Sequence, residues 1–359
     1  MTAEPIELVG LSRPQLTEAL VGAGLSPHLV RPLWNRIYVQ GVTDLSTWDG
    51  LSPDHRRILC ETFRVGRLHV ISDLTSTDAT RKWLLELRDT QRIETVVIPE
   101  QTGGALCISS QVGCSLTCSF CRTGTMNSVR NLTPAEIVGQ VLIARDRLRE
   151  WGQRRVDCRF ANVVLMGMGE PLFNYDNVAA AVRILIDGEG LSISRRRIML
   201  STAGVVPLIE RVGRELGVNL AISLHAVRNE LRDQLVPLNR KYPLEELLNA
   251  CRRYPAASNA RRITFEYVML DGVNDSDTDA RVLARLLKGI HAKVNLIPWN
   301  PWPGAPYQTS TPTRVRSFAE IVNSAGYSSA IRATRGDDIM AACGQLNAMT
   351  RPRVGGMRD

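Results

Sequence analysis

Apolar positions in the first 66 residues recur at helical spacing in three short stretches. Leu29, Leu33 and Trp34 would share one face of the second of these helices. Each stretch begins with a serine and has a proline in its first turn, a combination that favours a helix start. These pairs are Ser12 and Pro14, Ser26 and Pro27, and Ser52 and Pro53. We therefore expect residues 1–66 to form a small N-terminal helical domain.

The pattern then changes to short alternating runs of apolar and polar residues. Such alternation over residues 67–74, 82–88 and 92–98 predicts strands. The polar triplet at 89–91 between the last two predicts a tight turn. Residues 67–104 are therefore expected to form a β-hairpin connector between two larger parts.

From residue 105 onward, apolar β-branched runs alternate with amphipathic helical patterns. The strands are expected at 105–110, 160–166, 196–201, 217–223, 262–269 and 292–298. The helices are expected at 134–150, 175–187, 205–215, 243–253, 276–289 and 312–325. Six such units predict an α/β core, 105–346, with a parallel sheet curved into an open or partial (βα)6 barrel. A last strand at 328–333 and a helix at 337–346 would end this core, leaving a basic tail at 347–359.

Composition adds a partner class and a compartment. The 359 residues carry a net charge of +8, with only four lysines among the 44 basic residues, and the excess lies beyond residue 80. An excess of arginine favours a polyanion such as nucleic acid, although arginines spread over a solvated surface would give the same total. Without a long apolar run or a leader pattern, the chain is expected to be cytoplasmic, free of membranes and reduced at its cysteines.

Three of the eight cysteines lie within eight residues. Cys114, Cys118 and Cys121 have the spacing C-x3-C-x2-C directly after the first core strand. A structural zinc site needs four ligands, and the remaining cysteines offer no second pair. A cubane iron–sulfur cluster can instead use three cysteines and leave one iron open. A structural metal in a non-catalytic RNA-binding protein remains the alternative.

Small and polar residues gather where the expected strands end, which is where α/β barrels bind their ligands. A glycine there lets a ligand approach the backbone, and a carboxylate can accept a cationic group. The residues at these strand ends are Gly169, Glu170, Ser201, Ser223, Leu224, His225 and Asn300.

With the cysteine spacing and these strand ends, the sequence resembles the radical S-adenosylmethionine (SAM) superfamily. The resemblance implies a [4Fe-4S] cluster, one per chain, held by Cys114, Cys118 and Cys121, and SAM bound by the strand-end residues named above. Three further segments, around Glu94, around Asn300 and around Cys343, narrow the resemblance to the bacterial dual-specificity RNA adenine C2-methyltransferases of the RlmN type.

That family implies an unusual route to a carbon that is not nucleophilic. One SAM methylates Cys343; a second yields a deoxyadenosyl radical that activates the S-methyl group for addition to adenine C2. Glu94 then matches the proton acceptor, and Cys107 resolves the adduct through a transient disulfide with Cys343. The implied substrates are 23S rRNA at the peptidyl-transferase centre and tRNA at the adenine 3′ to the anticodon. Flavodoxin or ferredoxin would supply electrons to a monomeric enzyme.

Two related readings stay open on these residues. One is the C8-adenine rRNA methyltransferase type, which confers antibiotic resistance and shares the cluster and both reactive cysteines. The other is a radical SAM enzyme that acts on a peptide or a small molecule. Five arginines near the strand ends are candidates for RNA contacts: Arg122, Arg130, Arg195, Arg196 and Arg197.

Overall fold

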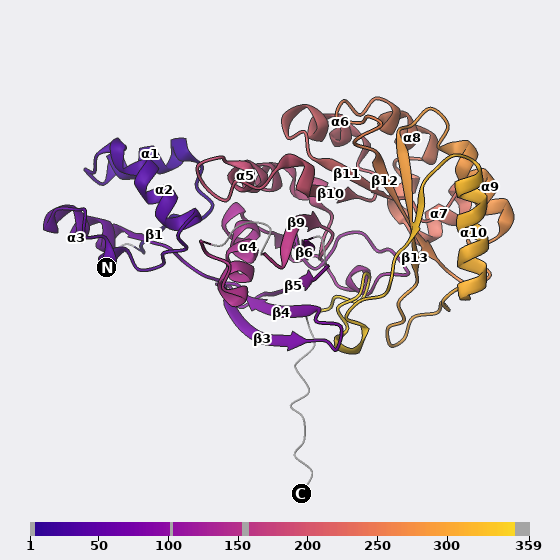
Figure 1. Cartoon of the computed structure of the whole chain (residues 1–359), viewed down its shortest axis with the longest axis horizontal. Coiled ribbons are helices and arrows are strands. Elements are labelled where there is room, and N and C mark those ends of the chain that lie inside the picture. The colour runs from indigo at the N-terminus through magenta and orange to yellow at the C-terminus, as the bar shows by residue number, and fades with distance from the viewer. Residues whose placement is uncertain (1–3, 101–102, 153–157, 349–359) are drawn as a thin grey trace, which may run out of the picture.

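The computed structural model describes residues 4–100, 103–152 and 158–348. Its N-terminal part is helical, as expected, and forms the separate group of helices at one end of Figure 1. It contains α1 (Arg13–Gly22), α2 (Val30–Tyr38) and α3 (Pro53–Thr62), with β1 (Ile6–Glu7) paired in parallel with β2 (Phe63–Arg64). The side chains of Ser12, Ser26 and Ser52 accept backbone N–H groups at the predicted helix starts.

One ten-stranded sheet runs through the rest of the molecule, in the order β14-β13-β12-β11-β10-β9-β6-β5-β4-β3. Its parallel strands are β6 (Gly104–Cys107), β9 (Phe160–Leu165), β10 (Ile198–Thr202), β11 (Asn219–Ser223), β12 (Ile263–Met269), β13 (Ala292–Pro298) and β14 (Ser329–Ile331). This confirms the predicted parallel core. All seven residues of β12 are buried, as expected for a strand covered on both faces.

The expected hairpin connector is a continuation of this sheet. It comprises β3 (His69–Thr75), β4 (Arg81–Glu86) and β5 (Arg92–Ile98), which pair antiparallel with one another. Strand β5 in turn pairs antiparallel with β6, the first core strand. The predicted strands are therefore confirmed, and they extend the wall of the barrel on the side of β6.

Helices follow the parallel strands and cover the outer face of the curved sheet (Figure 1). They are α4 (Pro134–Leu148), α5 (Tyr175–Ile186), α6 (Val206–Glu215), α7 (Asn229–Leu235), α8 (Leu244–Arg252), α9 (Asp277–Leu286) and α10 (Pro312–Ser324). A small ribbon, β7 (Gln111–Val112) with β8 (Arg130–Asn131), closes the base of the cysteine loop. None of the described helices is long and apolar enough to cross a membrane.

The predicted helix at 337–346 is wrong. Only Asp337–Ile339 forms a single 3-10 turn. Gly336, Met340 and Gly344 all have positive φ angles, between 53° and 83°, which an α-helix cannot accommodate. The segment therefore folds as a loop, so no helix begins near Cys343. Of the predicted basic tail at 347–359, residues 349–359 lie outside the described part of the chain.

The N-terminal helices are fastened to the core by ion pairs. Arg13 of α1 binds Asp187 at 2.7 Å, and Arg67 binds Asp146 of α4 at 2.7 Å. Gly10, with a φ of 89°, lies against Ala135 so closely that a Cβ would meet its backbone nitrogen at 2.4 Å. Polar pairing and this close backbone approach together fix the domain on the end of the barrel.

Candidate active site

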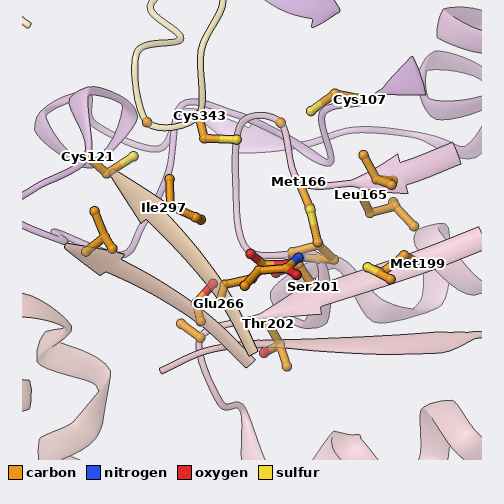
Figure 2. Close-up of a pocket in the computed structure, with 18 of the residues that line it drawn as sticks. Cys107, Cys121, Leu165, Met166, Met199, Ser201, Thr202, Glu266, Ile297 and Cys343 are labelled. Atoms are coloured by element: carbon orange, nitrogen blue, oxygen red, sulfur yellow. The ribbon is translucent and has the colours of Figure 1, made fainter. Parts of the chain in front are cut away.

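A cavity of about 400 Å³ occupies the inside of the curved sheet (Figure 2). Strands β6 and β9 to β13 contribute side chains that face this space, since alternate residues of a strand point to one face. The contributing residues include Cys107, Val164, Ser201, Ser223, Glu266 and Ile297. The predicted cysteine loop closes the cavity at the carboxyl ends of the strands.

Cys114, Cys118 and Cys121 all line this cavity, as the spacing predicts. The loop turns tightly: Cys121 donates its N–H to the carbonyl of Cys118, and Gly124 donates to Cys121. Burial raises the pKa of all three thiols, to about 12 for Cys114, and the neighbouring thiols raise those of Cys114 and Cys118 further. The thiols thus stay neutral until a cation binds, and a bound metal deprotonates them.

The three thiols fit a cluster better than a single ion. Within residues 4–100, 103–152 and 158–348, no three Cys, His, Asp or Glu side chains lie close enough together to hold one metal ion. A cubane needs a wider arrangement, because each thiolate binds a different iron. The loop offers three cysteine thiols that all line the cavity, which is the number of protein ligands of a [4Fe-4S] cluster with an open iron.

Gly169 and Glu170 line the same cavity as the three cysteines, so they would contact a ligand bound beside the cluster. Gly169 has a φ of 97°, and a Cβ there would meet the Gln111 side chain at 2.5 Å, so only glycine fits. Glu170 is buried and accepts N–H groups from Leu172 and Ala203 at 3.0 and 2.8 Å. Burial raises its pKa to about 7 against the effect of these donors. A cationic group bound beside Glu170 would stabilise its buried carboxylate in the charged form.

Three of the other predicted strand-end residues line the same cavity: Ser201, Ser223 and His225. His225 accepts an N–H from Val268 at Nδ1, and burial together with Arg232 lowers its pKa to about 3, so it is neutral. Its ring packs edge-on against Phe120 of the cysteine loop, with centroids 4.6 Å apart. Leu224 is fully buried and is not among the residues that line the cavity. Its N–H donates to the carbonyl of Glu266, which does line the cavity.

Cys343 and Cys107 both line the first cavity. Figure 2 shows their thiols pointing toward one another, and both are free, so no disulfide joins them in this structure. Cys343 also lines a second cavity of about 210 Å³, together with Asn300, Arg332 and Arg335. Asn300 is not among the residues lining the first cavity; it donates to the carbonyl of Cys343 at 3.0 Å. Cys343 thus stands at the boundary between two spaces.

Glu94 is separate from both cavities. It is buried on β5, where Lys82 lies 3.0 Å from one carboxylate oxygen and the N–H of Asn347 donates to the other at 2.6 Å. The neighbouring Glu100, by contrast, lines both cavities. Glu94 therefore reaches the site only through the segment that carries Cys343.

The RNA contacts expected of the five arginines stay a prediction, and the structure shows where most of these residues lie. Arg130 is taken up by Asp89 and Glu136, each 2.7 Å away. Arg195, Arg196 and Arg197 precede β10 at the amino ends of the strands, and Arg196 and Arg197 line the first cavity there. The sequence analysis missed Arg332, which is exposed and lines both cavities beside Cys343. It also missed Glu266, a carboxyl in the barrel that accepts a hydrogen bond from Asn295, although a charge inside an apolar strand could have revealed it.

Comparison with known proteins agrees with this geometry. The Radical SAM superfamily model matches residues 108–282. The chain is 58% identical over 349 residues to the dual-specificity RNA methyltransferase RlmN of Granulibacter bethesdensis, covering 96% of this chain and 88% of that one. The chain belongs to the RlmN family. The RlmN of Gluconobacter oxydans is also 58% identical, over 95% of this chain and 84% of its own length.

A solved structure of a methyltransferase agrees with this assignment. A radical SAM methyltransferase from Sphaerobacter thermophilus superposes with a TM-score of 0.89 at 43% identity, covering 96% of this chain and all of that one. Membership in the RlmN family and the radical SAM superfamily brings with it a [4Fe-4S] cluster and SAM. The three-thiol loop beside Glu170 is the part of this structure that suits both.

Proposed function

We propose that this chain methylates C2 of adenine in 23S rRNA and in tRNA, carrying the methyl group on Cys343. The relatives are named dual-specificity RNA methyltransferases. The observation that carries the proposal for this chain is the place of Cys343, on the boundary between the cavity of the cysteine loop and a second cavity rimmed by arginines. A thiol there can collect a methyl group on one side and deliver it on the other.

Cys114, Cys118 and Cys121 would hold the cluster, which together with SAM supplies a 5′-deoxyadenosyl radical able to activate an inert C–H bond. Beside it, the carboxylate of Glu170 would accept the ammonium group of SAM, and the backbone of Gly169 would line the same part of the cavity. Ser201, Ser223 and His225 supply further polar contacts along the cavity wall. Leu224 and Asn300 would support this binding through the backbone and through the Cys343 carbonyl.

Cys343 would act first as a nucleophile: its thiolate would attack the methyl carbon of SAM, forming a new S–C bond while the methyl–sulfonium bond breaks and S-adenosylhomocysteine leaves. Desolvation by the surrounding protein raises the pKa of its thiol, while the Arg332 guanidinium opposes this rise and favours the thiolate. Cys107, facing Cys343, would then attack its sulfur and release the methylated base through a transient disulfide. Glu94 is the proposed acceptor of the C2 proton, a role that requires its release from Lys82 and Asn347.

RNA would reach Cys343 through the second cavity. Arg332 and Arg335 are both exposed at its edge and suit phosphate contacts. The target adenine must leave its stack to meet a thiol at the boundary of two cavities.

We assign residues 1–66 to a domain that helps to grip the RNA, residues 67–104 to the connector and residues 105–346 to catalysis. Flavodoxin or ferredoxin would reduce the cluster of a cytoplasmic, monomeric enzyme.

The test is anaerobic reconstitution with iron and sulfide, followed by incubation with SAM, a reductant and fragments of 23S rRNA or tRNA. Mass spectrometry of the digested RNA should find 2-methyladenosine in both. Cys343→Ala should abolish the product, and Cys107→Ala should trap an RNA adduct on Cys343. Formation of 8-methyladenosine alone would instead support the C8 type, and RNA methylation by Cys343→Ala would refute the methyl-carrier role.

A further inference from the structure

The segment that carries Cys343 has almost no regular structure of its own. We refer to residues 340–347 as the Cys343 loop. It follows the single 3-10 turn at Asp337–Ile339, and Met340 itself has a φ of 53°. Such a segment cannot fix a thiol by repeated backbone hydrogen bonds, so contacts from elsewhere must hold Cys343 at the boundary of the two cavities.

One buried ion pair contacts both ends of this loop. Lys82 on β4 and Glu94 on β5 are diagonal neighbours on these adjacent strands, with 3.0 Å between Nζ and Oε1, and their side chains are 8% and 3% exposed. Lys82 Nζ also donates to the carbonyl of Met340 at 3.0 Å. The second oxygen of Glu94 accepts the N–H of Asn347 at 2.6 Å. Cys343 lies between these two anchors.

The turn between β3 and β4 adds a second set of contacts just before the loop. Ser76 Oγ and the N–H of Thr77 both donate to the carboxylate of Asp338, at 2.6 and 3.1 Å. The N–H of Gly336 donates to Asp78 at 3.0 Å. The antiparallel strands that extend the barrel therefore hold the whole approach to Cys343.

An apolar pair of similar volume could fill the space of Lys82 and Glu94 without the desolvation penalty that buried charges carry. What an apolar pair could not supply is a donor for the Met340 carbonyl and an acceptor for the Asn347 N–H. Neither Lys82 nor Glu94 lines either of the two cavities described above. In this structure both can therefore affect the site only through their contacts with the Cys343 loop.

We propose that Lys82 is a positioning residue for methyl transfer: with Glu94, it clamps the two ends of the Cys343 loop and so sets where the Cys343 thiol stands. This inference rests on the proposed role of Cys343 as the methyl carrier. The clamp also couples the proposed proton acceptor to the loop, because any movement that frees Glu94 must release Asn347.

The experiment compares Lys82→Met with Arg81→Met in the reconstituted enzyme. Arg81 is the neighbouring residue on β4 and pairs with Asp73 at 2.6 Å without contacting the Cys343 loop. Amide hydrogen exchange, read by mass spectrometry, should rise about tenfold in residues 341–347 for Lys82→Met and stay at the wild-type rate for Arg81→Met. The kcat for RNA methylation should fall about tenfold or more, with the KM for SAM within about twofold of wild type.

Lys82→Arg should restore slow exchange and most of kcat, since a guanidinium can still reach the Met340 carbonyl. Unchanged exchange in Lys82→Met, or an equal rise in Arg81→Met, would overturn the clamp. Should Lys82→Met fail to fold, Ser76→Ala removes an outer contact instead, and it must speed exchange across residues 336–347 for the inference to stand. Hydrogen exchange tests the clamp without any turnover of the enzyme. The proposed function has a separate test: RNA methylation by the Cys343→Ala variant would refute it and leave the exchange result unaffected.

Discussion

Arg232 is fully buried, and its guanidinium joins several backbone carbonyls beneath the site. It donates to the carbonyls of Leu224, Ala203 and Ser223 and to the side chain of Asn239, over 2.6 to 3.1 Å. Burial lowers its pKa to about 10, so it keeps its charge at neutral pH. It therefore links the carboxyl ends of the neighbouring strands β10 and β11, where the proposed SAM-binding residues lie.

Arg232→Met should destabilise the fold, because the carbonyls it satisfies stay buried without a donor. We expect a loss of about 3 kcal/mol or more in the free energy of unfolding, since each orphaned polar group costs about 1–3 kcal/mol. Chemical denaturation followed by fluorescence measures this loss. Arg214→Met, on the exposed face of α6, is the control and should differ little from wild type; equal effects of the two substitutions would contradict the role given to Arg232.

Glu170 makes SAM binding depend on pH. Its pKa of about 7 is above the ordinary value because of burial, so acidification protonates it and removes the charge that would attract an ammonium group. SAM affinity should thus be lower at pH 6 than at pH 8, by up to about tenfold. Equilibrium dialysis with the reconstituted enzyme measures this. Glu170→Gln should bind more weakly and lose most of the pH dependence, whereas an equal wild-type affinity at both pH values would rule out the carboxylate contact.

At the scale of elements, local capping determines where helix α4 begins, directly after the ribbon that closes the cysteine loop. Thr133 accepts the N–H of Glu136, and the Glu136 side chain accepts the N–H of Thr133, which together form a capping box. The same carboxylate also binds Arg130 of β8 at 2.7 Å. The cap therefore links the start of the helix to the base of the loop.

Thr133→Ala should lower the free energy of unfolding by about 1 kcal/mol, the usual cost of removing an N-cap oxygen. Chemical denaturation of the whole chain provides the measurement. Thr133→Ser keeps the oxygen and serves as the matched control. An alanine variant as stable as the serine variant would show that Glu136 and Arg130 hold the helix start without the cap.

At the scale of the whole molecule, two cavities share one thiol, and the exposed arginines stand on the outer one. Arg332 and Arg335, which line the second cavity beside Cys343, contribute part of the net charge of +8 there. The N-terminal helices, held by Arg13 and Arg67, lie at one end of the barrel (Figure 1). RNA that reaches Cys343 must fit the surface between these parts.

Arg332→Gln should weaken RNA binding in a salt-dependent way. Removing one phosphate contact should reduce the slope of log affinity against log salt concentration by about 0.7–0.9. Filter binding of tRNA at several salt concentrations gives this slope. Arg214→Gln, on outer helix α6, should keep the wild-type slope; the same slope for Arg332→Gln would mean that this arginine contacts no phosphate.

Local patterns in the sequence were sufficient for most elements. Alternation and helical periodicity located the strands of the barrel and all its described helices but α7 to within a few residues, because each element must bury one face or stripe. The C-x3-C-x2-C run was sufficient for the cysteine loop, since all three thiols come from one short segment. The failure at 337–346 has a local cause as well: helical spacing in that segment is overruled by positive φ angles at Gly336, Met340 and Gly344.

The sequence by itself determined the order of the elements and the three-thiol loop, and its resemblance to a family supplied the candidates for the reactive residues. Only the tertiary structure decided what surrounds them: that β3–β5 extend the barrel sheet, that Cys343 lies between two cavities, and that Lys82 and Glu94 grip its loop. The reason is physical. Periodicity records which face of an element is buried, whereas the pairing of Lys82 with residues 258 positions away depends on how the sheet closes in space.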